Sequence, residues 1–143
     1  MKILYAIQGT GNGHVSRARE IVPLLQKYGD LDILISGTQA DVKLTQDIKY
    51  QLHGFSFIFG KKGGVNHFKT WSNMNLPRFR KDMNAIPLKD YNLIINDFEP
   101  VTAQAAKQQN KASFAIGHQY AFLHDIPMEH ANLMSKLVFK HFA

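Results

Sequence analysis

Five short apolar segments, separated by helical stretches and loops, constrain the fold of this chain more than any other feature. They run from Lys2 to Ile7, Asp32 to Ser36, Phe55 to Phe59, Tyr91 to Asn96 and Ala112 to Ile116. Continuous apolar runs of this length are typical of parallel strands whose two faces are both covered by helices. The alternation therefore predicts an α/β fold with a doubly wound parallel sheet, in the strand order 3-2-1-4-5.

Two of the segments between strands carry helix signals. Apolar residues recur at helical spacing from Val15 onward, with Ser16 as the expected N-cap and Gly29 as the expected stop. Pro100 stands where a second helix should begin, because proline favours the first turn, and this helix is expected to reach Gln109. Both helices follow strands directly, as crossover helices of a parallel sheet do.

Length and composition fit one globular domain spanning residues 1–143. The chain is 45% hydrophobic and 20% charged, and it has no cysteine, which excludes disulfides and thiolate metal sites. Its apolar runs fall far short of the ~20 residues of a membrane span, and we expect a cytoplasmic protein. The last apolar residues, from Leu133 to Phe142, fit one helix face without a capping glycine or polar tail. We therefore expect a fragment that is cut at Ala143.

A glycine-rich loop, Gly9-Thr-Gly-Asn-Gly-His14, joins the first strand to the first helix. Glycines let a backbone approach a ligand closely, and a helix N-terminus offers N–H groups to an anion. A dinucleotide fingerprint would need glycine at Asn12 or His14 and an acidic residue after the second strand, where the sequence has Ser36-Gly-Thr38. A Walker loop would need Lys in place of His14. The loop is a candidate binding site of another kind, or simply a tight turn.

The stretch from this loop into the helix, Gly9-Thr-Gly-Asn-Gly-His-Val-Ser-Arg-Ala-Arg-Glu-Ile-Val-Pro-Leu-Leu25, resembles the opening of GT-B glycosyltransferases. It is most similar to the lipid-linked N-acetylglucosaminyltransferase of peptidoglycan synthesis and its relatives. The resemblance implies that residues 1–143 form a Rossmann-like, N-terminal acceptor-side domain. A C-terminal domain, missing from this chain, would bind the nucleotide-sugar donor, and no further cofactor is implied.

His14 and Asp97 are the candidate catalytic residues. An imidazole at the mouth of the loop has the chemistry to take a proton from a sugar hydroxyl. Asp97 follows the fourth strand, which should lie beside the first, so Asp97 is the best orienting partner and Glu99 the second. The resemblance implies the same pair of roles for His14 and Asp97. The alternatives are that His14 only packs the first helix and that Asp97 or Glu99 only charges the start of the helix at Pro100.

Six residues at the expected crevice are candidates for holding the acceptor, because polar groups after buried strands suit sugar hydroxyls. They are Gly11, Asn12, Gly13, Glu99, His118 and Gln119. The spacing of His118, His124 and His130 suggests metal binding, but Pro127 interrupts any helix that would join them and no carboxylate cluster completes a site. We therefore expect no metal.

The segment 60–89 carries seven basic residues against one acidic residue, a balance of +6 that equals the net charge of the whole chain. Aromatic residues interleave with this charge, as in surfaces that contact anionic headgroups or an amphiphilic, phosphorylated acceptor. The expected membrane or acceptor surface consists of Lys69, Trp71, Arg78, Phe79, Arg80 and Lys81. A solvated insertion is the alternative. Nucleic acid is not expected as a partner, because no known nucleic-acid module matches the pattern.

Taken with the resemblance, these features predict the acceptor-binding half of an inverting glycosyltransferase. The full-length enzyme would move a sugar from a nucleotide-sugar donor to a hydroxyl acceptor, including a lipid-linked one at the inner face of the membrane. The chain alone should be inactive, because the donor domain is missing. Two alternatives stay open: a stand-alone sugar- or nucleotide-binding module, and the N-terminal half of a nucleotide-sugar epimerase.

Overall fold

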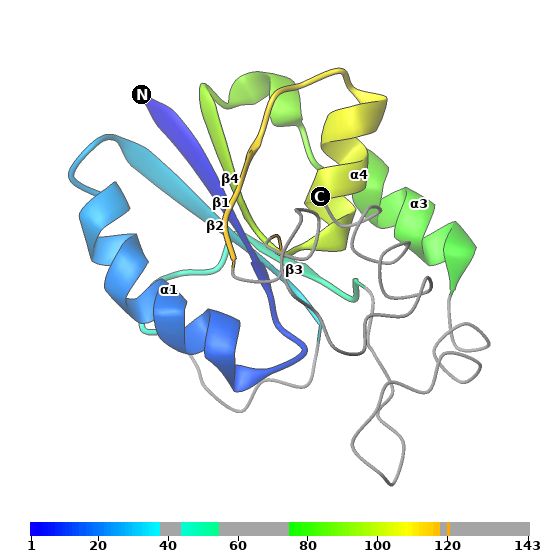
Figure 1. Ribbon diagram of the computed structural model, residues 1–143. Helices are drawn as coiled ribbons and strands as arrows, with labels where there is room; N and C mark the ends of the chain where they lie inside the picture. Colours follow the sequence, from blue (N-terminus) through cyan, green and yellow to red (C-terminus); the bar gives the residue numbers. More distant parts are fainter. Residues whose placement is uncertain (38–43, 55–74, 118–119, 121–143) are drawn as a thin grey trace, which may run out of the picture.

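The computed structural model describes residues 1–37, 44–54, 75–117 and 120, and within them a five-stranded sheet in which every strand pair is parallel (Figure 1). The strand order is β3-β2-β1-β4-β5, which confirms the predicted order. The strands are β1 (Lys2–Gln8), β2 (Asp30–Ser36), β3 (Tyr50–Leu52), β4 (Leu93–Asp97) and β5 (Phe114–Ala115). The chain thus has the Rossmann-like α/β fold expected of a GT-B N-terminal domain.

Helices cover both faces of the sheet. Figure 1 shows α1 (Asn12–Leu25) on one side, and α3 (Leu76–Asn84) beside α4 (Pro100–Gln108) on the other. A 3-10 turn, η1 (Leu88–Asp90), precedes β4. None of the helices in the described part of the chain is long and apolar enough to cross a bilayer.

The strands present alternate side chains to the two faces, and each face has its own apolar core. On β1, Tyr5 and Ile7 pack in the core that includes α1, whereas Leu4 and Ala6 pack in the core that includes α4. The same alternation determines the face of the sheet, and therefore the helix, toward which a polar side chain at the end of a strand points.

Helix α1 differs from its prediction at both ends. It begins at Asn12 with extended Gly11 as its N-cap, so the prediction of Ser16 as N-cap is wrong. Glycine is tolerated at this position, which lets the helix begin directly from the loop. The helix ends at Leu25, before Gly29. A Cβ at Gly29 would lie 1.9 Å from the Met1 carbonyl oxygen, so glycine is needed there for close packing rather than as a helix stop.

The strand beside β2 also differs from its prediction. It is Tyr50–Leu52, whereas the predicted third strand, Phe55–Phe59, lies outside the described residues, as does the predicted C-terminal helix. Helix α4 begins at Pro100 and ends at Gln108, which confirms the second predicted helix to within one residue.

Candidate functional site

The candidate site lies at the carboxyl edge of the two central strands. Ile7 of β1 is in register with Asp97, the last residue of β4, and the glycine loop leaves β1 just beyond this point. The first turn of α1 carries His14 over the same edge. Two segments more than 80 residues apart in sequence therefore meet at one place, as expected for neighbouring parallel strands.

His14 and Asp97 form a hydrogen-bonded pair. Nδ1 of His14 lies 2.7 Å from Oδ1 of Asp97, whose side chain is fully buried, while the His14 side chain is 14% exposed. A carboxylate can only accept, so Nδ1 donates, and in the neutral ring the lone pair is then on Nε2. The carboxylate thereby fixes the tautomer in which Nε2 can accept a proton.

Asp97 has two further partners. Tyr5 donates its phenolic hydrogen to Oδ2 at 3.0 Å, Nε of Arg17 donates to the same oxygen at 3.0 Å, and a terminal nitrogen of Arg17 donates to Oδ1. Burial alone would raise the pKa of Asp97, but the hydrogen bonds from His14 and Arg17 outweigh it and hold this pKa below its usual range. Burial and the charge of Asp97 raise the pKa of Tyr5, so Tyr5 stays a neutral donor.

Sequence reasoning did not single out Tyr5 or Arg17 as site residues. Arg17 follows His14 by three positions, a spacing that puts both side chains on one face of a helix. Tyr5 precedes Ile7 by two positions and so shares its face of the sheet, the face on which Asp97 also lies. Once Asp97 is placed at the end of β4, helical periodicity indicates Arg17 and strand periodicity indicates Tyr5 as its neighbours.

Phe98 holds the ring of His14 from one side. The two rings stack with centroids 6.1 Å apart and an interplanar angle of 7°, and the ring of Tyr120 meets Phe98 edge-on at 5.7 Å. Phe98 has a φ of 55°, in the left-handed region that costs a bulky residue about 1–3 kcal/mol. Such strain persists where the surrounding contacts fix it, and here those contacts orient the imidazole.

The glycines of the loop fall into two groups. Gly9 donates to the Ser36 carbonyl at 2.6 Å, and a Cβ there would lie 2.7 Å from the Ile35 side chain, so Gly9 is required by packing. At Gly11 and Gly13, by contrast, an added Cβ would have no atom of the described chain within 4 Å. Close packing therefore requires the first glycine of the loop, whereas the described chain leaves open space beside the next two.

A family model described as glycosyl transferase family 1 matches residues 1–140. The chain belongs to this family. No curated protein and no solved structure matches the chain. Family and fold together identify a GT-B glycosyltransferase domain, without distinguishing the peptidoglycan enzyme from other members.

The Glu99 carboxylate of this family 1 domain binds groups other than His14 and Asp97. Its side chain is fully buried, and its carboxylate accepts from the backbone N–H groups of Val101 and Thr102 at 2.7 and 2.6 Å and from the Ser36 hydroxyl at 2.6 Å. Glu99 is thus the N-cap of α4. Complete burial raises its pKa, although these hydrogen bonds oppose the shift. Because its carboxylate is buried and bonded inside the domain, Glu99 is not among the proposed acceptor contacts.

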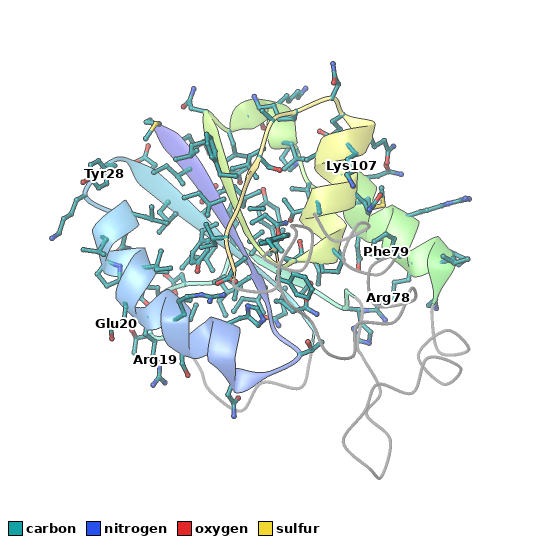
Figure 2. The ribbon with its side chains drawn as sticks, viewed as in Figure 1. Arg19, Glu20, Tyr28, Arg78, Phe79 and Lys107 are labelled. Carbon is teal, nitrogen blue, oxygen red and sulfur yellow. The ribbon has the colours of Figure 1, made fainter. Side chains whose placement is uncertain are left out.

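Changing Glu99 to Gln should lower the free energy of unfolding by about 1–2 kcal/mol, because an amide has one acceptor oxygen where the N-cap uses two. Urea denaturation followed by circular dichroism measures the change. Glu20→Gln is the matched control, since Glu20 is exposed on α1 (Figure 2). Equal stability of the Glu99→Gln and Glu20→Gln chains would show that the cap contributes nothing.

The other predicted site residues divide by position. His118, Gln119, Lys69 and Trp71 lie outside the described residues. Arg78, Arg80 and Lys81 are exposed on α3, where Figure 2 marks Arg78. Phe79 is half-buried and packs against the core beneath α3 and α4, so its place on the expected surface stays a prediction. Leu76, 49% exposed, is the apolar side chain that this helix presents outward.

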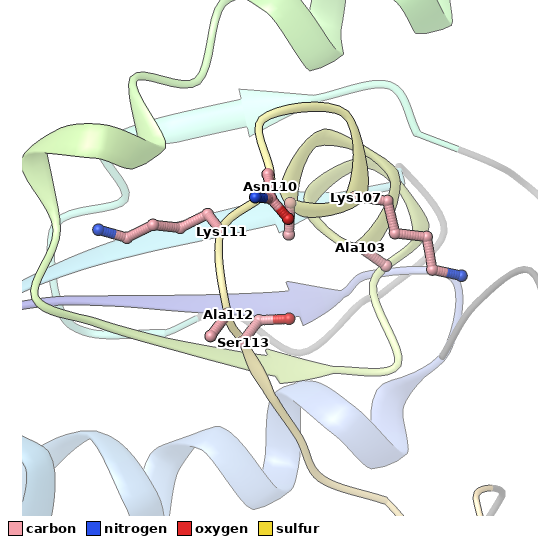
Figure 3. A pocket seen from close by; sticks show the side chains of 7 residues that line it. Ala103, Lys107, Asn110, Lys111, Ala112 and Ser113 are labelled. Carbon is pink, nitrogen blue, oxygen red and sulfur yellow. The ribbon is translucent and has the colours of Figure 1, made fainter.

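One hollow in the surface of the domain does not include the residues of the site. Figure 3 shows the side chains around this hollow, between α4 and the segment before β5. The volume of this hollow is about 400 Å³. It is lined by Ala103, Ala106, Lys107, Asn110, Lys111, Ala112 and Ser113. Within the described ranges, no three His, Cys, Asp or Glu side chains gather as metal ligands do.

Proposed function

We propose that this family 1 domain is the acceptor-binding half of an inverting glycosyltransferase and that His14 is its general base. The 2.7 Å contact between His14 and the buried Asp97 is the observation that carries the proposal. It orients a mostly buried imidazole beside open loop backbone, at the sheet edge where α/β folds bind ligands. The nucleotide-sugar donor would be bound mainly by a second domain.

In the proposed step, Nε2 of His14 takes the proton from the acceptor hydroxyl as its oxygen attacks the anomeric carbon of the donor. The new carbon–oxygen bond forms while the bond between the sugar and the nucleotide diphosphate breaks, so the electron pair leaves with the diphosphate. The buried carboxylate of Asp97 stabilises the imidazolium that results and keeps the ring in place. Backbone groups of Gly11, Asn12 and Gly13 would hold the acceptor beside Nε2.

We further propose that the acceptor side of the domain contacts anionic lipid or a lipid-linked phosphorylated acceptor through α3. Arg78, Arg80 and Lys81 are exposed there, with Leu76 as the exposed apolar residue beside them. Asn75 caps the helix by accepting from the Arg78 backbone N–H at 3.0 Å, which fixes the first turn of the helix that carries these side chains. Lys69 and Trp71 would extend this surface.

Acceptor binding by the 143-residue chain is testable without a donor domain. In a ¹⁵N-labelled chain, octyl glycosides of glucose, galactose or N-acetylglucosamine should shift the backbone amide signals of residues 11–14. Free UDP should leave these signals in place, because the proposal assigns nucleotide binding to another domain. Shifts of the same amides by UDP alone, with none from any glycoside, would contradict an acceptor-side role and favour a nucleotide-binding module.

A further inference from the structure

Arg17 touches both members of the pair His14–Asp97. Its Nε and one terminal nitrogen donate to the two different oxygens of the Asp97 carboxylate, which is the bidentate arrangement that a guanidinium makes with an acid. The same terminal nitrogen lies 3.1 Å from Nδ1 of His14. The guanidinium therefore lies against the ring nitrogen as well as against the carboxylate.

The position of the hydrogen on Nδ1 determines whether the contact between Arg17 and His14 is a hydrogen bond. Nδ1 cannot donate to Asp97 and accept from Arg17 at the same time, and the charged carboxylate at 2.7 Å is the stronger partner. The Arg17 nitrogen is then 3.1 Å from a nitrogen that already bears hydrogen. A positive charge at this distance opposes the addition of a second proton to the ring.

Charge balance leads to the same result. Asp97 is fully buried and bears one negative charge, which the Arg17 guanidinium neutralises while the imidazole is uncharged. Protonation of the ring would leave a net positive charge in a partly desolvated cluster. Without Arg17, the protonated ring would instead be the form that neutralises the buried carboxylate.

The other groups around the cluster do not change this balance. Tyr5 reaches Asp97 from β1 as a neutral phenol. Tyr120 contacts Phe98, and burial together with the charge of Asp97 raises the pKa of Tyr120 to about 12, so it is neutral near pH 7. Glu99 follows β4 but bonds with Ser36 and the start of α4. Among the described residues around the ring, Arg17 and Asp97 thus supply the charge.

We propose that Arg17 is a positioning residue that holds the Asp97 carboxylate and opposes protonation of the His14 imidazole. Its relevance to catalysis rests on the proposed role of His14 as base, since only the unprotonated ring can take a proton from an acceptor. Arginine suits this place because it combines a permanent charge with a planar fork, whereas lysine would supply the charge alone.

An NMR pH titration of the His14 ring in the 143-residue chain tests the proposal directly. In the Arg17→Gln chain the ring should titrate about 1 pH unit higher than in the wild type, because a nearby positive charge has been removed. Arg17→Lys retains the charge and should titrate close to the wild type. Arg19→Gln, which removes a charge from the outer side of the same helix (Figure 2), should leave the titration unchanged.

A titration of Arg17→Gln that overlays the wild type would overturn the proposal, with a retained amide spectrum confirming the fold. Should that chain not fold, Arg17→Met provides a second neutral side chain, and the same shift is expected. When this domain is joined to a donor-binding domain, the acid limb of the kcat/KM profile of the Arg17→Gln enzyme should move to higher pH by a similar amount. If the titration shifts in Arg17→Gln but His14→Ala keeps full turnover, the charge effect of Arg17 stands and His14 is not the general base. If the titration does not shift but His14→Ala loses turnover, His14 remains the general base and the proposal for Arg17 is wrong.

Discussion

Replacing His14 with alanine should lower turnover roughly 10²–10⁴-fold, the usual contribution of a positioned general base. The measurement is kcat in a sugar-transfer assay, with this domain joined to a donor-binding domain because we propose that the donor is bound there. Donor affinity should stay nearly unchanged, since His14 lies on the acceptor side. Asp97→Asn should also reduce kcat, because an amide at this position can accept from Nδ1 but carries no negative charge to stabilise the imidazolium that forms.

His53→Ala is the matched control, because His53 is exposed and follows the edge strand β3, which β2 separates from β1. Its turnover should equal that of the wild type. If His14→Ala and His53→Ala turn over equally fast, His14 is a structural residue of α1. A loss of donor binding in His14→Ala with kcat unchanged would instead place the imidazole at the donor.

The sheet was predictable from sequence because its central strands are apolar on both faces. The run from Ile3 to Ile7 is fully buried, and such continuous burial marks a parallel strand even without an alternating pattern. The edge strand Tyr50–Leu52 was not predictable in the same way, because within the described ranges its three residues pair with β2 alone and they give no periodic signal. Sequence patterns therefore located the central strands and the edge strand β5, but not the edge strand β3.

The candidate site was predictable only in part, and Glu99 shows why. Asp97 and Glu99 are two positions apart, so an uninterrupted strand would place both carboxylates on the same face. The strand ends at Asp97, however, and Phe98 takes a left-handed conformation that turns the chain. Asp97 stays with His14 and Arg17, while Glu99 caps α4. The residue types around position 98 do not predict a positive φ at a phenylalanine.

The second large effect concerns the exposed basic side chains of α3. Changing Arg78, Arg80 and Lys81 together to alanine should weaken binding of the chain to anionic vesicles on the order of a hundredfold, because each basic residue at such a surface contributes about 1 kcal/mol. Sedimentation with vesicles of one part phosphatidylglycerol to three parts phosphatidylcholine measures the loss. Raising the salt should imitate it, since the attraction is screened beyond a Debye length.

Charge position, rather than net charge, should decide the binding. The control changes Arg19, Lys27 and Lys111 to alanine, which removes the same charge from parts of the domain outside α3 and should leave vesicle binding nearly intact. Equal weakening in both triple variants would mean that the overall charge of +6 draws the chain to the membrane without a defined surface. If the wild type does not sediment with anionic vesicles even at low salt, the lipid proposal fails. Helix α3 would then be better tested as a contact for a soluble phosphorylated acceptor, because the same three cations suit a phosphate in either setting.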